Sequence, residues 1–582
     1  MEPVTGRLWV PRNESPDSSV LIEFQEQLQL SQLVARLLVG RDYSLESARR
    51  FLTARLTDLP DPFLLPDMDI AVSRLHTALE NGEKIAIHGD YDVDGITGTA
   101  LLFAGLAALG DSELAYHIPL RLRDGYGLSA EALKEAAARG TRVVVSVDCG
   151  VTAHAEATLA NEHGIDLIIT DHHQPPATLP DAFAVINPQR QDSVFPFRSL
   201  AGVGVAFFLL VALRKRLRDT GWFADRPEPD LRQYLDLVAL GTIADLVPLQ
   251  GVNRTLTRYG LALLDTDHRI GVRALKQVAG VKEINSGVVG FQLAPRLNAA
   301  GRMEDAGLGV ELLLEQDMPR ALNMARYLDQ CNRERQSLEK QTLQEAEVAV
   351  AGLPAGHTHV IVLAGEAWHP GVIGIVASRL VERYGRPTVM IALAGERGKG
   401  SARSIRGYHL YQGLQSCAGH LVAFGGHEMA AGMSLDKGQL AGFAAALEAH
   451  ARESLSDEDL IPKLPHDGVL LLEEIDLEAL RQIEGMAPFG MGNPEPLLVI
   501  ESVRVMRVQT VGDHHLRFTV CQGAFSHPAI AFGMLARRNE FQGEVDLLVT
   551  PQINIYKNRE SVQLRVRDVR PSSLTSHHLH VP

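Results

Sequence analysis

Cysteine is scarce in this sequence, and the 582 residues include only four, at positions 149, 331, 417 and 521. Because no two of them form a CxxC pair, neither a disulfide framework nor a structural zinc site is expected. Long apolar runs are also missing: Val205 to Leu213 has about half the roughly 18 residues of a membrane span. The N-terminus shows no basic patch followed by an apolar stretch. We therefore expect a cytoplasmic protein with reduced thiols and no membrane contact.

An excess of basic residues is missing as well. The chain has 56 Lys and Arg against 71 Asp and Glu, and its formal net charge is −15. This balance argues mildly against a nucleic-acid partner, because phosphate binding usually leaves a basic footprint. The distribution is uneven, however, since residues 501–582 carry ten Lys or Arg and seven Asp or Glu, a local balance of +3. The sequence therefore permits a basic channel inside an acidic shell.

The pattern of apolar residues predicts an α/β fold. Short β-branched runs alternate with helical stretches; these runs are 84–88, 114–118, 142–147 and 166–170. Such runs separated by helices are typical of a doubly wound parallel sheet. Residues 319–351 lack glycine and inner proline and predict one long connecting helix of roughly 50 Å, at 1.5 Å per residue.

A second α/β lobe is expected after this helix, and five short alternating runs near the C-terminus predict an OB-type β-barrel. The predicted domains are an N-terminal helical segment (1–70), a catalytic α/β domain (71–265), an inter-lobe segment with the long helix (266–351), the second lobe (352–460) and the barrel (461–575).

Acidic and histidine residues follow the predicted strands at the points where the strands end. These residues are His88, Asp90, Asp92, Asp94, Asp148, Asp171, His172 and His173, with Asp245 at the end of a later helical stretch. The carboxyl ends of parallel strands share one edge of a sheet, where ligands bind. Oxygen and imidazole ligands without cysteine favour two divalent cations, Mn²⁺ or Mg²⁺, over structural zinc.

Single members of this set also fit more ordinary roles. Asp90, Asp92 and Asp94 resemble the start of an EF-hand loop, but Leu101 stands where its glutamate should be, and a strand leads in. A lone aspartate after a strand is usually a helix cap. The coincidence of four such clusters favours a metal centre.

Asp171-His172-His173 resembles the signature of the DHH phosphoesterases, and His88-x-x-x-Asp92-x-Asp94 resembles their first motif. By that resemblance, the first cation is held by His88, Asp92 and Asp148. The second cation is held by Asp94, Asp148, His172 and Asp245. The predicted catalytic residues are His173, which faces the scissile phosphate, Arg302, and Asp90, which is additional to the family pattern.

Further stretches resemble the RecJ exonucleases within this family, namely 294–303, 368–379, 400–404 and Gly425-Gly426-His427. The resemblance implies a second lobe of the DHHA1 type and a single-strand-specific 5′→3′ DNA exonuclease that releases 5′-mononucleotides in recombination and repair. The substrate-binding residues that it implies are Arg121, Asn298, Arg296, Ser401, Arg403, Gly425, Gly426 and His427. Of these, Ser401, Arg403 and His427 with Arg121 are expected to hold a 5′-terminal phosphate.

The implied partners are single-stranded DNA, single-strand-binding protein and a RecQ-type helicase, and a monomer is expected. On the barrel, Phe518, Phe532 and Tyr556 are candidate stacking platforms for bases. The alternatives are a DHH phosphodiesterase acting on short oligonucleotides or cyclic dinucleotides, and a non-catalytic DNA-binding scaffold.

Overall fold

The computed structural model describes residues 1, 6–13, 17–120, 127–303, 307–354 and 358–572. The chain divides into two compact units. The larger unit consists of Pro11–Asp329 and His466–Pro582, and the smaller unit of Met1–Val10 and Gln330–Pro465. Within the described residues, no helix combines the length and apolarity needed to cross a membrane.

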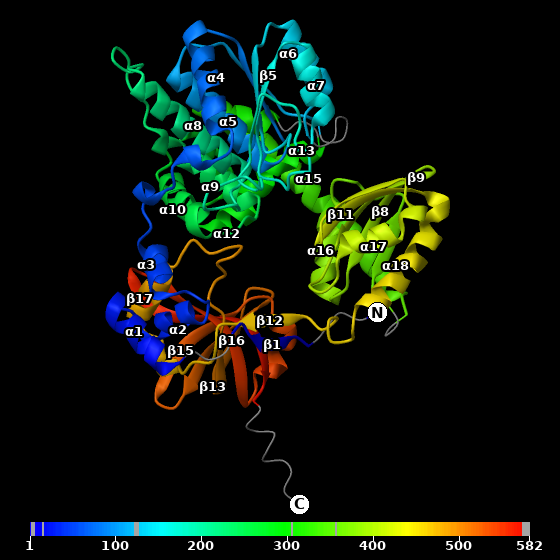
Figure 1. The fold of residues 1–582 in the computed structure, drawn as a ribbon. Helices are drawn as coiled ribbons and strands as arrows, with labels where there is room; N and C mark the ends of the chain where they lie inside the picture. The colour runs from blue at the N-terminus through cyan, green and yellow to red at the C-terminus, as the bar shows by residue number, and fades with distance from the viewer. Residues whose placement is uncertain (2–5, 14–16, 121–126, 304–306, 355–357, 573–582) are drawn as a thin grey trace, which may run out of the picture. The chain divides into compact units, whose positions relative to one another are not determined.

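A parallel five-stranded sheet organises the larger unit (Figure 1). Its strands are β2 (Ile85–Gly89), β3 (Leu114–His117), β4 (Val143–Val147), β5 (Asp166–Thr170) and β6 (Ala184–Ile186), in the order β3-β2-β4-β5-β6. The β-branched strands are buried on both faces, as parallel strands require. Val143, Val145 and Val147 face one hydrophobic core, whereas Val144 faces another. The predicted doubly wound sheet is confirmed.

Helices cover both faces of this sheet. One core is completed by α4 (Met68–Asn81), α5 (Val93–Leu109), α8 (Gly202–Asp219) and α9 (Leu235–Ala244). The opposite core takes side chains from α6 (Ala130–Ala138) and α7 (His154–Glu162). The chain continues through α10 (Gly251–Asp265), α11 (Ile270–Ala279), α12 (Ser286–Val288), the π-helical turn η4 (Val289–Leu293), α13 (Ala294–Met303) and α14 (Gly307–Leu314).

The C-terminal strands close into the predicted barrel. They are β13 (Leu498–Val511), β14 (His515–Gln522), β15 (Phe525–Ala531), β16 (Glu544–Tyr556) and β17 (Arg559–Pro571), in the order β13-β14-β15-β17-β16. Lys557 and Asn558 both have positive φ, which suits the tight turn of the β16–β17 hairpin. The prediction of Phe518 as a stacking platform is wrong, because this side chain is buried in the barrel core.

The barrel shares its hydrophobic core with the N-terminal helices. These are α1 (Ser18–Leu28), α2 (Gln32–Val39) and α3 (Leu45–Thr53), and α19 (Leu477–Gly485) packs beside them. Phe24, Leu33 and Leu37 are almost fully buried in the same cluster as Leu516 and Leu547 of the barrel strands. The N-terminal helices therefore depend on the barrel for the burial of their apolar faces.

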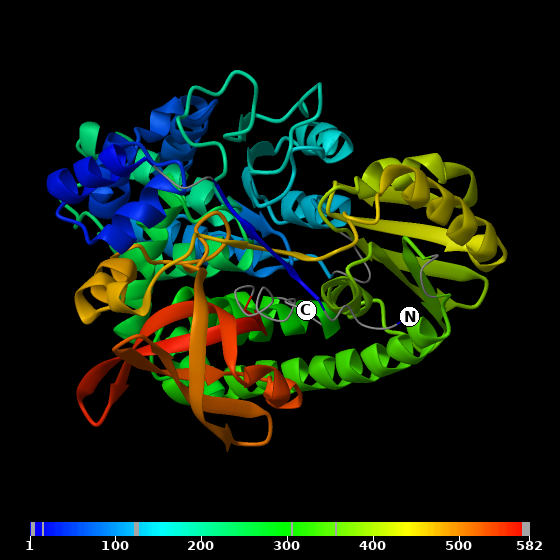
Figure 2. The same cartoon turned by 90° about the horizontal axis from the view of Figure 1, so that it is seen from below.

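The predicted long helix is α15 (Met318–Ala351), drawn in green as one continuous helix in Figure 2. In the smaller unit it is followed by a five-stranded mixed sheet in the order β10-β11-β9-β8-β7. The strands are β7 (Ile361–Gly365), β8 (Thr388–Ala394), β9 (Arg397–Arg403), β10 (Ala423–Gly426) and β11 (Ala430–Asp436). Its helices are α16 (Ile373–Tyr384), α17 (Leu410–Ser416) and α18 (Leu440–Ser454), and β1 (Leu8–Pro11) pairs with β12 (Lys463–His466).

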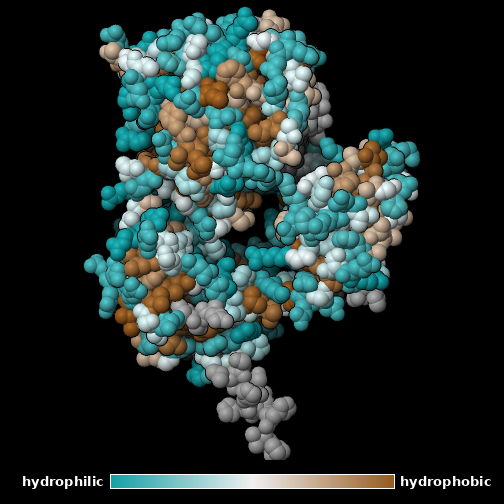
Figure 3. All heavy atoms as spheres, viewed as in Figure 1, coloured by the Kyte–Doolittle hydropathy of each residue, from teal (hydrophilic) through white to brown (hydrophobic). Residues whose placement is uncertain are grey.

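Hydrophilic residues cover most of the face seen in Figure 3, with hydrophobic residues in smaller groups between them. A few large hydrophobic side chains are nevertheless strongly exposed among the described residues. The most exposed are Phe291 (86%), Val348 (77%), Val194 (71%), Ile555 (67%) and Tyr556 (67%).

Candidate active site

The predicted ligands gather where the winding of the parallel sheet reverses. β2 lies between β3 and β4, so the chain winds in one direction from β2 to β3 and in the other from β4 onward. In an open α/β sheet such a switch point leaves a crevice at the carboxyl ends of the strands. Asp90 follows β2, Asp148 follows β4, and His172 follows β5, so all three border this crevice.

Two helix N-termini position the carboxylates after β2. Asp92 caps α5, and its Oδ1 accepts hydrogen bonds from the backbone N–H groups of Asp94 (2.9 Å) and Gly95 (3.2 Å). The buried carboxylate of Asp94 accepts N–H groups of Gly202 (2.6 Å) and Val203 (2.9 Å) at the start of α8. The positive end of the α8 dipole therefore helps to hold the charge of Asp94.

Glycine is required at position 202 for this packing. A Cβ on Gly202 would lie 2.7 Å from Cβ of Asp148 and 3.0 Å from Oδ2 of Asp94. Any side chain there would push α8 away from the carboxylates. The sequence alone does not predict a role for Gly202. The only indication is the glycine-rich start of the helix, which is typical of a backbone that approaches other atoms closely.

Asp148 adopts an unusual backbone conformation at the end of β4. Its φ is +61°, in the left-handed region, which costs a residue with a side chain roughly 1–2 kcal/mol. In this conformation Oδ1 lies 3.0 Å from Nε2 of His172. The same Nε2 is 3.5 Å from Oδ2 of Asp245 and 3.9 Å from Oδ2 of Asp94, so three carboxylates surround one imidazole nitrogen.

These carboxylates are strongly destabilised as anions when no cation is present. Burial, followed by repulsion from neighbouring carboxylates, raises the pKa of Asp94 to about 7 and that of Asp245 to about 9. The same causes raise the pKa of Asp148 well above its usual range. Burial also lowers the pKa of His172 to about 4, which keeps the ring in the neutral form that binds metal.

The geometry forms three groups of potential metal ligands, and within each group the ligand atoms lie within 4.8 Å of one another. The groups are Asp94–His172–Asp245, Asp148–His172–His173 and Asp90–Asp92–Asp148. Carboxylate oxygens with imidazole nitrogens suit Mn²⁺ or Mg²⁺. Burial raises the pKa of the adjacent Cys149 well above its usual range, so its thiol stays protonated and is no ligand. The residues present therefore fit a pair of hard divalent cations.

His88 is held differently from the other predicted ligands. Its Nε2 accepts the backbone N–H of Ser129 (3.1 Å), and burial, followed by the neighbouring His117, lowers the pKa of His88 to about 3. In this arrangement Nε2 is occupied by a hydrogen bond, and His88 belongs to none of the three ligand groups. Asp90, by contrast, lies with Asp92 and Asp148. The geometry favours Asp90 over His88 as a ligand.

His173 is oriented by the first residue of its own motif. Its Nδ1 lies 2.8 Å from Oδ1 of Asp171, a fully buried carboxylate that also accepts the N–H groups of His172 and His173. Burial alone would lower the pKa of His173, but the hydrogen bond and charge of Asp171 outweigh it and raise this pKa. The side chain of His173 is 38% exposed, and its raised pKa favours the protonated form. Asp171 belongs to the sequence motif, but the motif alone does not predict its orienting role.

We expect metal binding to release protons, because ligand carboxylates must be ionised to hold a cation. At pH 7.5, which is below the pKa of about 9 for metal-free Asp245, this group is protonated before Mn²⁺ binds. The calorimetric enthalpy of Mn²⁺ binding should therefore vary with the ionisation enthalpy of the buffer. Above pH 9 this variation should fade. Identical enthalpies in Tris and HEPES at pH 7.5 would contradict the raised pKa values.

The predicted substrate-binding residues of the larger unit differ in how they are engaged. Arg296 on α13 pairs with Asp329 (2.9 Å) and also donates to the carbonyl of Gln292. Asn298 is half-buried on the same helix. Arg121 and the side chain of Arg302 lie outside the described residues.

The predicted phosphate-binding residues of the smaller unit lie together on its sheet. Arg403 on β9 donates to Oγ of Ser401 (3.2 Å) and to the carbonyl of Ala402 (2.8 Å). A Cβ on Gly374 would lie 2.8 Å from Oγ of Ser401, so the start of α16 approaches these side chains closely.

The glycine-histidine motif neighbours the same strand positions. Gly425 is aligned with Gly432, which is aligned with Ser401 on the next strand. Ala430, the partner of Arg403, accepts the backbone N–H of His427. Gly426 has φ +142°, and a Cβ there would lie 2.5 Å from the carbonyl oxygen of Ala430.

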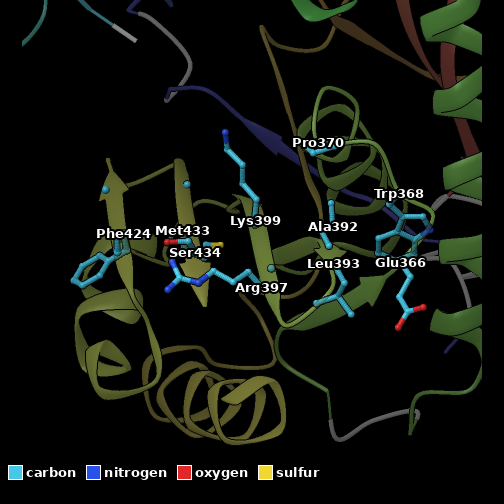
Figure 4. Close-up of a pocket in the computed structure, with 16 residues that line it drawn as sticks. Glu366, Trp368, Pro370, Ala392, Leu393, Arg397, Lys399, Phe424, Met433 and Ser434 are labelled. Carbon is cyan, nitrogen blue, oxygen red and sulfur yellow. The ribbon is translucent and has the colours of Figure 1, made fainter. Parts of the chain in front are cut away.

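A pocket of about 760 Å³ lies beside this group, and Lys399, Trp368 and Ala392 are among its lining residues (Figure 4). Lys399 rises from β9 in Figure 4, on the strand that also carries Ser401 and Arg403.

Three family models match the chain. The N-terminal domain of the DHH family matches residues 84–242, the DHHA1 domain matches 357–453, and the RecJ OB domain matches 466–568. The "Single-stranded-DNA-specific exonuclease RecJ" of Bacillus subtilis (strain 168) is 38% identical over 568 residues, which cover 96% of this chain and 70% of that protein. The protein of the same description from Escherichia coli (strain K12) is 39% identical over 528 residues, covering 87% and 91%.

A solved structure extends the likeness to the fold. The crystal structure of RecJ from Thermus thermophilus in complex with Mn²⁺ matches with a TM-score of 0.83 and 31% sequence identity. This match covers 97% of this chain and 80% of that chain. A second structure of the same protein, in complex with Mg²⁺, matches with a TM-score of 0.76 and 29% identity, covering 97% and 79%.

Proposed function

The chain belongs to the RecJ family of single-stranded-DNA-specific exonucleases, and from that premise we propose that it hydrolyses single-stranded DNA from the 5′ end with two divalent cations. The observation that carries the proposal is the cluster of carboxylate and imidazole groups around Asp148 at the switch point of the sheet. So many buried carboxylates repel one another strongly without a cation. A purely structural site would not need such a cluster.

Two sites assembled from these groups would each hold one cation, Mn²⁺ or Mg²⁺. The first site consists of Asp90, Asp92 and Asp148, with Asp90 replacing His88 from the motif, and the second of Asp94, Asp148, His172 and Asp245. Two divalent cations held by these residues would supply an activated water and would neutralise charge on the phosphoryl oxygens.

The remaining residues act on the substrate directly. His173, held by Asp171, would in its protonated form donate a hydrogen bond to a non-bridging oxygen of the scissile phosphate. Arg302 and Asn298 on α13 would contact the same nucleotide, whereas Arg296 would need to leave Asp329 to do so. Ser401, Arg403, Gly425, Gly426 and His427, with Arg121, would hold the 5′-terminal phosphate through charge-assisted and backbone contacts.

The finer parts of the proposal come from the family. On the family resemblance we also propose the five domain boundaries, a monomeric state and a cytoplasmic location. We further propose partnership with single-strand-binding protein and a RecQ-type helicase in recombination and repair. The alternative, hydrolysis of short oligonucleotides or cyclic dinucleotides, is disfavoured by the RecJ OB domain at 466–568. A barrel that binds extended strands would serve no purpose with such small substrates.

Polarity and strand preference are tested by one experiment. With Mn²⁺ present, the protein should release mononucleotides from 5′-labelled single strands and should leave blunt duplex intact. A strand blocked at its 3′ end should be consumed, whereas one blocked at its 5′ end should persist. Equal consumption of both blocked strands would refute the 5′→3′ direction. If the label were released only in short oligonucleotides, and not in mononucleotides, the short-oligonucleotide alternative would be favoured.

A further inference from the structure

A groove of about 1100 Å³ lies in the larger unit where the catalytic domain meets the barrel. Its walls come from α10, the segment 284–291, the segment 484–495 and the barrel strands β16 and β17. The residues that matter for its chemistry are Arg258, Phe291, Glu484, Glu495, Arg565 and Arg567.

Direct contacts fix the walls of this groove. Leu249 donates its backbone N–H to the carbonyl of Met491 (2.7 Å), and Ser286 donates its hydroxyl to the carbonyl of Phe489. The buried guanidinium of Arg254 donates to the carbonyls of Gly485 and Ala487, at 2.9 Å each. The groove is therefore built into the junction of the two domains, and a ligand would find it largely formed.

The charge of the groove favours an anionic ligand. Three arginines and two glutamates line the groove, and one of these glutamates, Glu495, is paired with Arg567. Among the described residues, Arg258 and Arg565 have no hydrogen-bonded or ion-paired acid. Two guanidinium groups therefore remain available for phosphates, opposed by Glu484 alone.

Aromatic rings lie beside these cations. Phe291, in the π-helical turn η4, is 86% exposed, the highest exposure among the described large hydrophobic residues. Phe532, at the end of β15, is 48% exposed, and the guanidinium of Arg565 lies 5.6 Å from its ring centroid. Exposed rings alternating with arginines are the usual surface for single-stranded nucleic acid, because bases stack on the rings and phosphates meet the cations.

We propose that this groove binds the single-stranded DNA that leads to the metal centre, with a base on Phe291 and phosphates at Arg258 and Arg565. OB barrels usually bind oligonucleotides across their second and third strands, which here are β14 and β15. In this chain the single-stranded DNA instead crosses β16 and β17, where the barrel faces the catalytic domain. The inference rests on the proposed function and names the path of its substrate.

Matched variants on the two barrel faces separate these paths. Phe291→Ala and the double variant Arg258→Ala/Arg565→Ala remove the groove contacts. Phe525→Ala on β15 and Arg517→Ala on β14 are the controls, because both side chains are exposed and lie on the usual face. Dissociation constants for a long single strand are measured on the full-length protein without divalent cation, and mononucleotide release is measured with Mn²⁺.

Phe291→Ala should weaken binding about 10- to 100-fold, as expected for the loss of one stacked base. The double variant should reduce the slope of log affinity against log salt by about 0.7 for each lost phosphate contact. Hydrolysis of very short oligonucleotides and the melting temperature should stay unchanged, and both control variants should bind like the wild type.

Two outcomes would overturn the inference. The first is that Phe291→Ala and the double variant bind single strands with wild-type affinity. The second is that Phe525→Ala and Arg517→Ala lose as much affinity as the groove variants. Both leave the proposed function standing if the wild type still degrades single strands from the 5′ end. If the wild type does not degrade them, the proposed function itself fails, and the binding data alone decide whether the groove holds single strands.

Discussion

Replacing Asp148 by alanine should abolish hydrolysis of single-stranded DNA, with a loss well beyond the roughly 10- to 100-fold that removal of an outer-sphere partner costs a metal site. Asp148 belongs to two of the three ligand groups, and its Oδ1 lies 3.0 Å from His172. Its loss therefore weakens both cation sites at once. The measurement is the rate of mononucleotide release with saturating Mn²⁺.

The stability of this variant separates a lost ligand from a lost fold. Burial, followed by the charges of Asp94, Asp92 and Asp245, raises the pKa of Asp148, so removing this side chain spares the metal-free protein the cost of burying an ionisable group. Metal-free Asp148→Ala should melt no lower than the wild type, apart from the small cost of a cavity. Mn²⁺ should raise the melting temperature of the wild type much more than that of the variant. Asp219, which is 59% exposed on α8, provides the matched control, since Asp219→Ala should keep full activity. Near-normal hydrolysis by a folded Asp148→Ala would refute the shared role.

The sheet and the meeting of the acidic residues could be predicted because both follow from local rules. Runs such as Val143–Val147 are β-branched and short, so they predict buried parallel strands. Once these strands are parallel, the residues after them must share an edge, which brings Asp148 beside His172. No long-range information was needed for either step.

The choice between His88 and Asp90 could not be made from the sequence. The motif pattern favours His88 as a ligand, and Asp90 is additional to that pattern. The difference depends on a backbone N–H of Ser129, 41 residues away, which occupies Nε2 of His88. Such a hydrogen bond depends on the loop that leads into α6, and spacing within a motif contains no information about it.

Phe518 is the opposite case, because a local rule is enough to place its side chain. It was predicted as a stacking platform, but it is only 2% exposed and packs against Phe541 with ring centroids 5.0 Å apart. On β14, Leu516, Phe518 and Val520 alternate with more exposed residues, so all three face the barrel core. The period of two alone excludes Phe518 from the surface. Phe532 and Tyr556, at 48% and 67% exposure, are on the surface as a platform requires.

The packing of the first helices also lay beyond the sequence. Periodicity indicates which face of a helix is apolar, but it does not indicate what covers that face. Phe24 and Leu33 enter the same core as the barrel, more than 400 residues later in the chain. A truncation before the barrel would therefore expose them, so point variants are better tests of the barrel than its deletion.

Arg403 is the residue on which the direction of digestion is expected to depend. A metal centre cuts whichever phosphodiester lies over it, so polarity requires a separate group that recognises one strand end. Arg403 is half-buried, is supported by Ser401, and is aligned with Ala430, which accepts the N–H of His427. Its guanidinium is therefore fixed in orientation, as bidentate recognition of a terminal phosphate requires.

Arg403→Ala should slow the degradation of 5′-phosphorylated single strands about 10- to 100-fold, because a charge-assisted contact contributes roughly 1.5–3 kcal/mol. Strands that begin with a 5′-hydroxyl lack the terminal phosphate, so their slower degradation should change little. Arg403→Lys keeps the charge but loses the planar fork, and should fall between the wild type and the alanine variant. Arg397 lies on the same strand, is largely exposed and pairs with Asp436, so Arg397→Ala is the matched control and should behave as the wild type. The measurement is kcat/KM for the two substrates. If Arg403→Ala slowed both substrates equally, the arginine would contact the body of the strand, and the terminal phosphate would have to be recognised by other residues.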